Sequence, residues 1–146
     1  MPHAERIRVI VDSLMHRPVV AADAAMTVRD AARQMERERV GCLIVLRGGK
    51  PVGIVTERDL VWRVLGAARD PGAIRLADVM STPIATVAQD ATVESAAELM
   101  KKLRVKRLLI LRDGIPLGVI SVTDIAYASP EASRMLDAAM RRSWDD

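Results

Sequence analysis

Gly53–Leu60 reads GIVTERDL, and Gly118–Ile125 reads GVISVTDI. Each stretch is a glycine-led apolar run that ends in a hydroxyl residue, with an aspartate three residues later. Branched apolar residues before a Thr or Ser indicate a strand that ends where a helix begins, because the hydroxyl can cap the helix. The same pattern recurs 65 residues later, which indicates that the chain is built from a repeat.

The repeat extends well beyond these two stretches. Leu14–Leu60 aligns with Val79–Ile125 at a constant offset of 65 residues without a gap, and about a third of the aligned positions are identical. Each copy has a short apolar piece, then a helix with 3.6-residue apolar spacing after a threonine, then two strands around a glycine turn, and a second helix. The apolar pieces are Val19–Val20 and Ile84–Ala85.

This pattern predicts an α+β fold made of two β-α-β-β-α repeats. Because one unit of this size has little core of its own, we expect the two repeats to pack sheet to sheet with pseudo-twofold symmetry. The expected segments are an N-terminal helix (4–14) with the first repeat (1–65), a linker broken at Pro71–Gly72 (66–77), the second repeat (78–128) and a C-terminal helical tail (129–146).

The composition limits the possible classes of protein. Half of the 146 residues are hydrophobic, yet there are only two Trp, one Tyr and no Phe, so the core must be aliphatic. The single cysteine, Cys42, excludes an internal disulfide and a cysteine-based zinc site. No apolar run is long enough to span a membrane, and the charged N-terminal residues cannot form a signal peptide. We therefore expect a cytoplasmic protein without membrane contact.

The charge pattern does not single out nucleic acid as the partner. The net charge is +3, but 19 acidic residues are mixed with 22 basic ones, and few aromatic residues are present to stack on bases. His3 and His16 both lie near the N-terminus with no acid–base constellation around them. Since no nucleophile–base pair is visible, we expect no catalysis and no metal site.

Several motifs together resemble one known family. They are DVMSTP (Asp78–Pro83), VGCLIVL (Val40–Leu46), VKRLLIL (Val105–Leu111) and the two stretches quoted first. The repeat resembles the CBS (cystathionine-β-synthase) domain, and the chain is similar to a stand-alone tandem pair, a Bateman module, from Leu14 to about Ala128. The resemblance implies a regulatory or sensor module that binds AMP, ADP, ATP or S-adenosylmethionine in the clefts between its repeats, without a catalytic cofactor.

The resemblance also implies which residues form two binding sites, each using the hydroxyl and aspartate of one repeat with strand residues of the other. The first site comprises Thr56, Arg58, Asp59, Ile84, Ala85, Lys106 and Arg107. The second comprises Val19, Val20, Gly41, Cys42, Ser121 and Asp124.

The chemistry of these residues agrees with the implied roles. A carboxylate can accept hydrogen bonds from both ribose hydroxyls, and a helix N-terminus with an arginine favours phosphate. Lys106 and Arg107 correspond to Gly41 and Cys42 in the first repeat. We therefore expect the site of Asp59 to hold the more highly phosphorylated ligand.

Thr-x-x-Asp is also the pattern of a capping box, in which the acid binds the N–H of the cap residue. The chain contains a control, because Thr27–Asp30 has the same pattern but Ser95 replaces its acid in the second repeat. Asp59 and Asp124 are both kept, and capping and binding can coexist.

The alternative function is a structural or dimerisation module with empty clefts, and a nucleic-acid-binding protein is the least favoured. We expect a homodimer through the helices at 59–65 and 124–128, and a separate regulated protein as the target.

Overall fold

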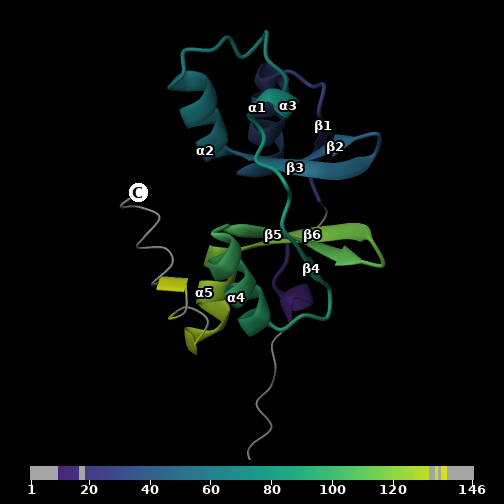
Figure 1. Ribbon diagram of the computed structural model, residues 1–146, viewed down its shortest axis with the longest axis vertical. Helices are drawn as coiled ribbons and strands as arrows, with labels where there is room; N and C mark the ends of the chain where they lie inside the picture. Colours follow the sequence, from purple (N-terminus) through teal and green to yellow (C-terminus); the bar gives the residue numbers. More distant parts are fainter. Residues whose placement is uncertain (1–9, 17–18, 132–133, 135, 138–146) are drawn as a thin grey trace, which may run out of the picture. The chain divides into compact units, whose positions relative to one another are not determined.

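The computed structural model describes residues 10–16, 19–131, 134 and 136–137 (Figure 1). The first repeat contains β1 (Ala21–Asp23), α1 (Val28–Glu38), β2 (Cys42–Arg47), β3 (Lys50–Thr56) and α2 (Glu57–Leu60), which continues as the π-helical turn η2 (Val61–Leu65). The second contains β4 (Thr86–Ala88), α4 (Val93–Leu103), β5 (Arg107–Arg112), β6 (Ile115–Ser121) and α5 (Val122–Ala128). A 3-10 turn, η1 (Val11–Ser13), precedes the first repeat, and α3 (Leu76–Val79) precedes the second. The predicted α+β class and the β-α-β-β-α order are confirmed.

The two sheets have the same topology and register. Their strand orders are β1-β2-β3 and β4-β5-β6, with a parallel first pair and an antiparallel hairpin. In the hairpins Cys42 pairs with Thr56, and Arg107 pairs with Ser121. The turn residues Gly49 and Gly114 have φ of 76° and 78°, a conformation that glycine adopts without strain. Equivalent registers confirm that the sequence repeat is a structural repeat.

The first strand of each repeat lies slightly later than the apolar piece that predicted it. β1 begins after Val20, and β4 begins after Ala85. The backbone carbonyls of these two residues still accept hydrogen bonds from β2 and β5, at 3.0 Å from Ile44 N and 2.9 Å from Leu109 N. The apolar pieces therefore lead into the parallel ladder.

The first helix of each repeat begins at the predicted threonine. Thr27 Oγ1 accepts a hydrogen bond from Asp30 N at 3.2 Å, and Thr92 Oγ1 accepts one from Ser95 N at 3.2 Å. Each helix turns a regularly spaced apolar face inward, so it packs on its own sheet. The buried residues are Val28, Ala31 and Met35 in α1, and Val93, Ala96, Ala97 and Met100 in α4.

Contacts between residues divide the chain into two compact units, and the segment before each sequence repeat belongs to the unit of the other repeat. One unit is Val19–Ile84, and the other joins the described residues before Val19 to those from Ala85 onward. Figure 1 shows α3 in the unit of β1–β3 and the purple η1 in the unit of β4–β6. Each unit encloses its own aliphatic cluster, as the composition predicts. The packing of one sheet against the other stays a prediction.

The structure adds detail to two parts of the predicted organisation. The segment expected as a linker is bonded to the start of α1, where Val28 N donates to Ile74 O at 3.0 Å and Leu76 N donates to Met26 O at 2.9 Å. Of the helix predicted at 4–14, residues 1–9 lie outside the described part, and the rest contains only the single turn η1.

In the C-terminal tail, Pro130, Glu131, Arg134, Leu136 and Asp137 are helical, and the other residues of the predicted tail helix lie outside the described part. Leu136 joins the core of its unit. Within the described residues, no helix combines the length and apolar character that a bilayer crossing requires.

Candidate functional site

The two aspartates form capping boxes. Asp59 Oδ2 accepts hydrogen bonds from Thr56 N at 2.9 Å and Thr56 Oγ1 at 3.1 Å. Asp124 Oδ2 accepts the same pair from Ser121, at 2.8 and 2.9 Å. Each hydroxyl oxygen lies 3.3 Å from the backbone N of its aspartate. The capping interpretation is therefore confirmed for both motifs, and capping uses only one oxygen of each carboxylate.

The other carboxylate oxygen contacts a different residue in each repeat. Asp59 Oδ1 accepts a hydrogen bond from Ser81 Oγ at 3.1 Å, and Arg63 Nε lies 3.8 Å away. Asp124 Oδ1 lies 2.8 Å from His16 Nε2. Ser81 and His16 are themselves 65 residues apart, so they occupy equivalent positions.

The sequence indicated no acid–base constellation around His16, but in the structure this residue contacts a carboxylate. Its partner, Asp124, lies 108 positions along the chain, where a search around the histidine could not find it. A signal was present, because the repeat alignment places His16 on Ser81, beside the Met15–Met80 pair.

Two glycines allow the segments that carry His16 and Ser81 to approach the sheets. A Cβ atom on Gly118 would lie 2.7 Å from His16 O, and one on Gly53 would lie 2.8 Å from Ser81 O. The backbones pair at these points, His16 with Val119 and Ser81 with Ile54. These contacts fix the positions of the residues that meet the carboxylates.

The predicted site residues fall into both units. One unit contains Thr56, Arg58, Asp59 and Ile84 of the first predicted site, with Val19, Val20, Gly41 and Cys42 of the second. The other unit contains Ala85, Lys106 and Arg107 of the first predicted site, with Ser121 and Asp124 of the second. The structure describes the two units separately, so the assembly of either site from both units stays a prediction.

Inside each unit, the start of the hairpin lies beside the start of the second helix. Gly41 O accepts a hydrogen bond from Glu57 N at 3.1 Å, and Lys106 O accepts one from Val122 N at 2.9 Å. Because Arg107 pairs with Ser121, a basic residue neighbours the second capping box. Cys42 holds the equivalent place beside the first capping box.

Arg58 is held by an aromatic ring. Its guanidinium carbon lies 3.9 Å from the centre of the Trp62 ring, a cation–π contact along one turn of α2 and η2. Arg58 is exposed, and its counterpart in the second repeat is Thr123, so only the first repeat carries this charge.

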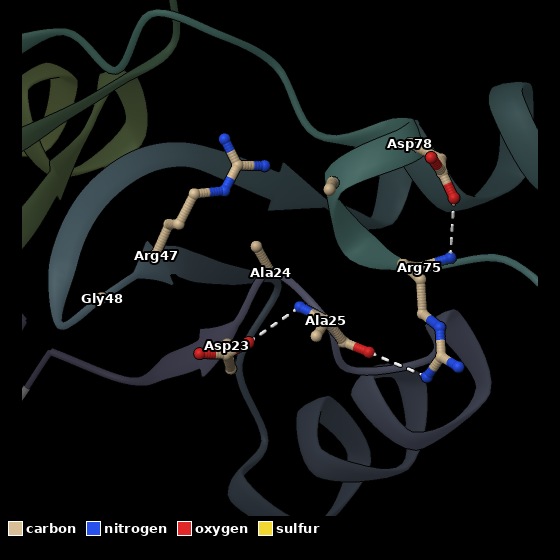
Figure 2. A pocket seen from close by; sticks show the side chains of 8 residues that line it. Asp23, Ala24, Ala25, Arg47, Gly48, Arg75 and Asp78 are labelled. Carbon is tan, nitrogen blue, oxygen red and sulfur yellow. Dashed lines mark hydrogen bonds between the residues drawn. The ribbon is translucent and has the colours of Figure 1, made fainter.

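Each unit also has a pocket that is lined by other residues. Figure 2 shows the pocket of the first unit, which is lined by Asp23, Arg47, Arg75 and Asp78 among others. Its volume is about 310 Å³. The second unit has a pocket of about 320 Å³ with Arg112 in the place of Arg47. Both lie at the turn end of the hairpin, opposite the capping boxes, and no predicted site residue lines them.

The pocket of the first unit is braced by hydrogen bonds among its own residues. Ala25 N donates to Asp23 at 2.8 Å, and Arg75 donates to Ala25 O at 2.9 Å (Figure 2).

Within the described residues, no three His, Cys, Asp or Glu side chains gather to hold a metal ion.

Comparison with known proteins also finds two copies of one domain in the chain. The family model of the CBS domain matches residues 11–66 and 76–131. The chain belongs to the CBS domain family. The predicted tandem pair is therefore confirmed.

Relatives of this CBS pair occur in archaea and bacteria. It is 29 % identical over 140 residues to the uncharacterized protein MK0525 of Methanopyrus kandleri, covering 94 % of this chain and 71 % of the relative. A hexameric CBS-CP12 protein from bloom-forming cyanobacteria has a similar structure, with a TM-score of 0.78 and 28 % sequence identity. The match covers 95 % of this chain and 94 % of that protein. A CBS-domain protein of Burkholderia ambifaria, provisionally assigned to signal transduction, also has a similar structure. Its TM-score is 0.71 and its sequence identity is 28 %, and the match covers 77 % of this chain and 82 % of that protein.

Proposed function

We propose that this CBS pair is a regulatory module that binds an adenosine-containing ligand, AMP, ADP, ATP or S-adenosylmethionine, through Asp59 and Asp124. One observation carries the proposal: each repeat holds a carboxylate at the same place, with one oxygen fixed in a cap and the other directed outside it. Membership of the CBS family and the provisional signalling assignment of the Burkholderia relative support a regulatory role.

The side chains suit the parts of such a ligand. A ribose donates from its hydroxyls to the carboxylate, and the fork of Arg107 with the ammonium of Lys106 neutralises phosphate. Ala85 is small enough to let the backbone reach a flat base. The role proposed for the two carboxylates is to bind the ribose, and no catalytic step is assigned to them. A cytoplasmic location fits this role and stays a prediction.

Thermal melting tests the proposal with AMP, ADP, ATP and S-adenosylmethionine. A ligand present at about 100 times its dissociation constant should stabilise the fold by about 2.7 kcal/mol. The double variant Asp59→Asn, Asp124→Asn should lose this shift. Asp30→Asn is the matched control, since Asp30 belongs to the same Thr-x-x-Asp pattern but lies exposed at the start of α1. No shift with any ligand, or an equal shift in the double variant, would contradict the proposal.

An interaction module is the second candidate, and the exposed apolar residues of the second helices favour it. They are Val61, Trp62 and Leu65 on η2 and Tyr127 on α5. The similar CBS-CP12 protein is a hexamer, so oligomers occur among the neighbours. If oligomers form and no adenosine ligand shifts the melting temperature, this function is the one that remains.

A further inference from the structure

We infer that His16 makes the Asp124 carboxylate selective against ligands that present a vicinal diol, whereas Ser81 leaves Asp59 open to them. This inference rests on the proposed function, because it takes the two carboxylates as the groups that bind ribose. It assigns the difference between the two sites to His16 and Ser81, which occupy equivalent positions of the two repeats.

The remaining hydrogen-bond capacity of each carboxylate carries the argument. An ionised carboxylate oxygen has about two lone-pair directions. At Asp124, Oδ2 already accepts from Ser121 N and Ser121 Oγ, so its capacity is used. A diol must therefore bind mainly through Oδ1, the atom that His16 Nε2 contacts at 2.8 Å. The same count at Asp59 leaves Oδ1 with one hydrogen bond, from Ser81 Oγ, and with Arg63 Nε at 3.8 Å as an ion-pair neighbour.

The two partners differ in what they do when a ligand arrives. A serine hydroxyl is small, rotates freely and can accept a hydrogen bond as well as donate one, so Ser81 can turn and bind an incoming ribose hydroxyl. The carboxylate accepts only, so His16 Nε2 must carry the hydrogen and has no lone pair left for the ligand. His16 takes one of the two lone-pair directions of Asp124 Oδ1, so a diol must displace His16 to place both of its hydroxyls on that atom.

The backbone keeps His16 in this position although its side chain is 76 % exposed. His16 N donates to Val119 O at 2.9 Å, and Val119 N donates to His16 O at 3.2 Å. Ser81 is held by the same pair of bonds to Ile54, at 2.8 and 3.1 Å. The two residues thus stand on equivalent supports, and the side chain is the difference between them.

Reciprocal substitutions in single-site proteins test this assignment. Asp59→Asn leaves Asp124 as the intact carboxylate, and Asp124→Asn leaves Asp59. Calorimetric titration compares AMP with 2′,3′-dideoxy-AMP, which lacks the diol. Adding His16→Ser to the first background should tighten AMP binding about fivefold to tenfold, and adding Ser81→His to the second should weaken it by a similar factor. The affinity for dideoxy-AMP should change less than about twofold in both.

The matched control is Ser13→Ala. Ser13 lies in the same segment as His16 and is exposed, and its hydroxyl donates to the Ile10 carbonyl instead of contacting the carboxylate. Melting temperatures establish that each variant is folded. If His16→Ser leaves AMP affinity unchanged while AMP still binds, the assignment of His16 is wrong and the proposed function stands. If AMP binds neither single-site protein nor the unmodified chain, the proposed function fails and the assignment fails with it.

Discussion

Trp62 and Tyr127 occupy equivalent positions of the two repeats, and both lie exposed on the helix that follows the hydroxyl–aspartate motif, at 62 % and 90 % of their surface. Two of the three aromatic residues of the chain thus share one position of the repeat. Large exposed rings gain from burial against a partner, and the expected dimer contact lies on these helices.

We predict that Trp62→Ser combined with Tyr127→Ser converts a dimer into a monomer, because the two rings are the largest exposed apolar side chains on these helices. Light scattering after size exclusion measures the mass. Ile115→Ser is the control, since Ile115 is 64 % exposed at the start of β6, next to the hairpin turn. A monomeric unmodified protein, or a double variant that stays dimeric, would contradict the predicted contact.

The two aspartates are predicted to contribute unequally to nucleotide binding. Asp59→Ala should weaken ATP binding more than Asp124→Ala does, because Arg58, Lys106 and Arg107 are expected at the first site. Each substitution also removes a capping interaction worth about 1 kcal/mol of folding stability, so titrations are run well below the melting temperature. Equal losses of ATP affinity would remove the argument for an electrically unequal pair.

Arg107 is predicted to recognise phosphate. Arg107→Ala should weaken ATP binding about tenfold and adenosine binding less than about twofold, because adenosine carries no phosphate. Lys101→Ala is the control, since Lys101 lies exposed on α4 within the same basic segment. A loss that is equal for ATP and adenosine would show that Arg107 acts on the fold or on the base.

The two close-approach glycines are predicted to be essential for stability. Gly53→Ala and Gly118→Ala should each lower the free energy of unfolding by about 1–3 kcal/mol, because the new methyl group meets a backbone carbonyl that cannot move cheaply. Urea denaturation measures the change.

Gly72→Ala is the control for these glycines, since its nearest atom beyond its chain neighbours is Asp70 Oδ1 at 3.5 Å. An effect within about 0.5 kcal/mol is expected there. Loss of stability at Gly72 but not at Gly53 or Gly118 would reverse the steric argument.

The sequence by itself determined the order of the elements and the caps. Thr27, Thr92, Thr56 and Ser121 all cap the helices that they predict, because a cap depends on residues within one turn. The hairpins were predictable for the same reason, since their register follows from a short turn between two apolar runs. The aliphatic core followed from the composition alone.

Only the tertiary structure decided which segment completes which sheet. His16 pairs with Val119, far along the chain, and no local period encodes that choice. The segments that carry His16 and Ser81 are too short for a pattern, and their positions come from backbone bonds and from the space left by Gly118 and Gly53. The sequence thus located both carboxylates, while the long-range pairing decided that one faces a serine and the other a histidine.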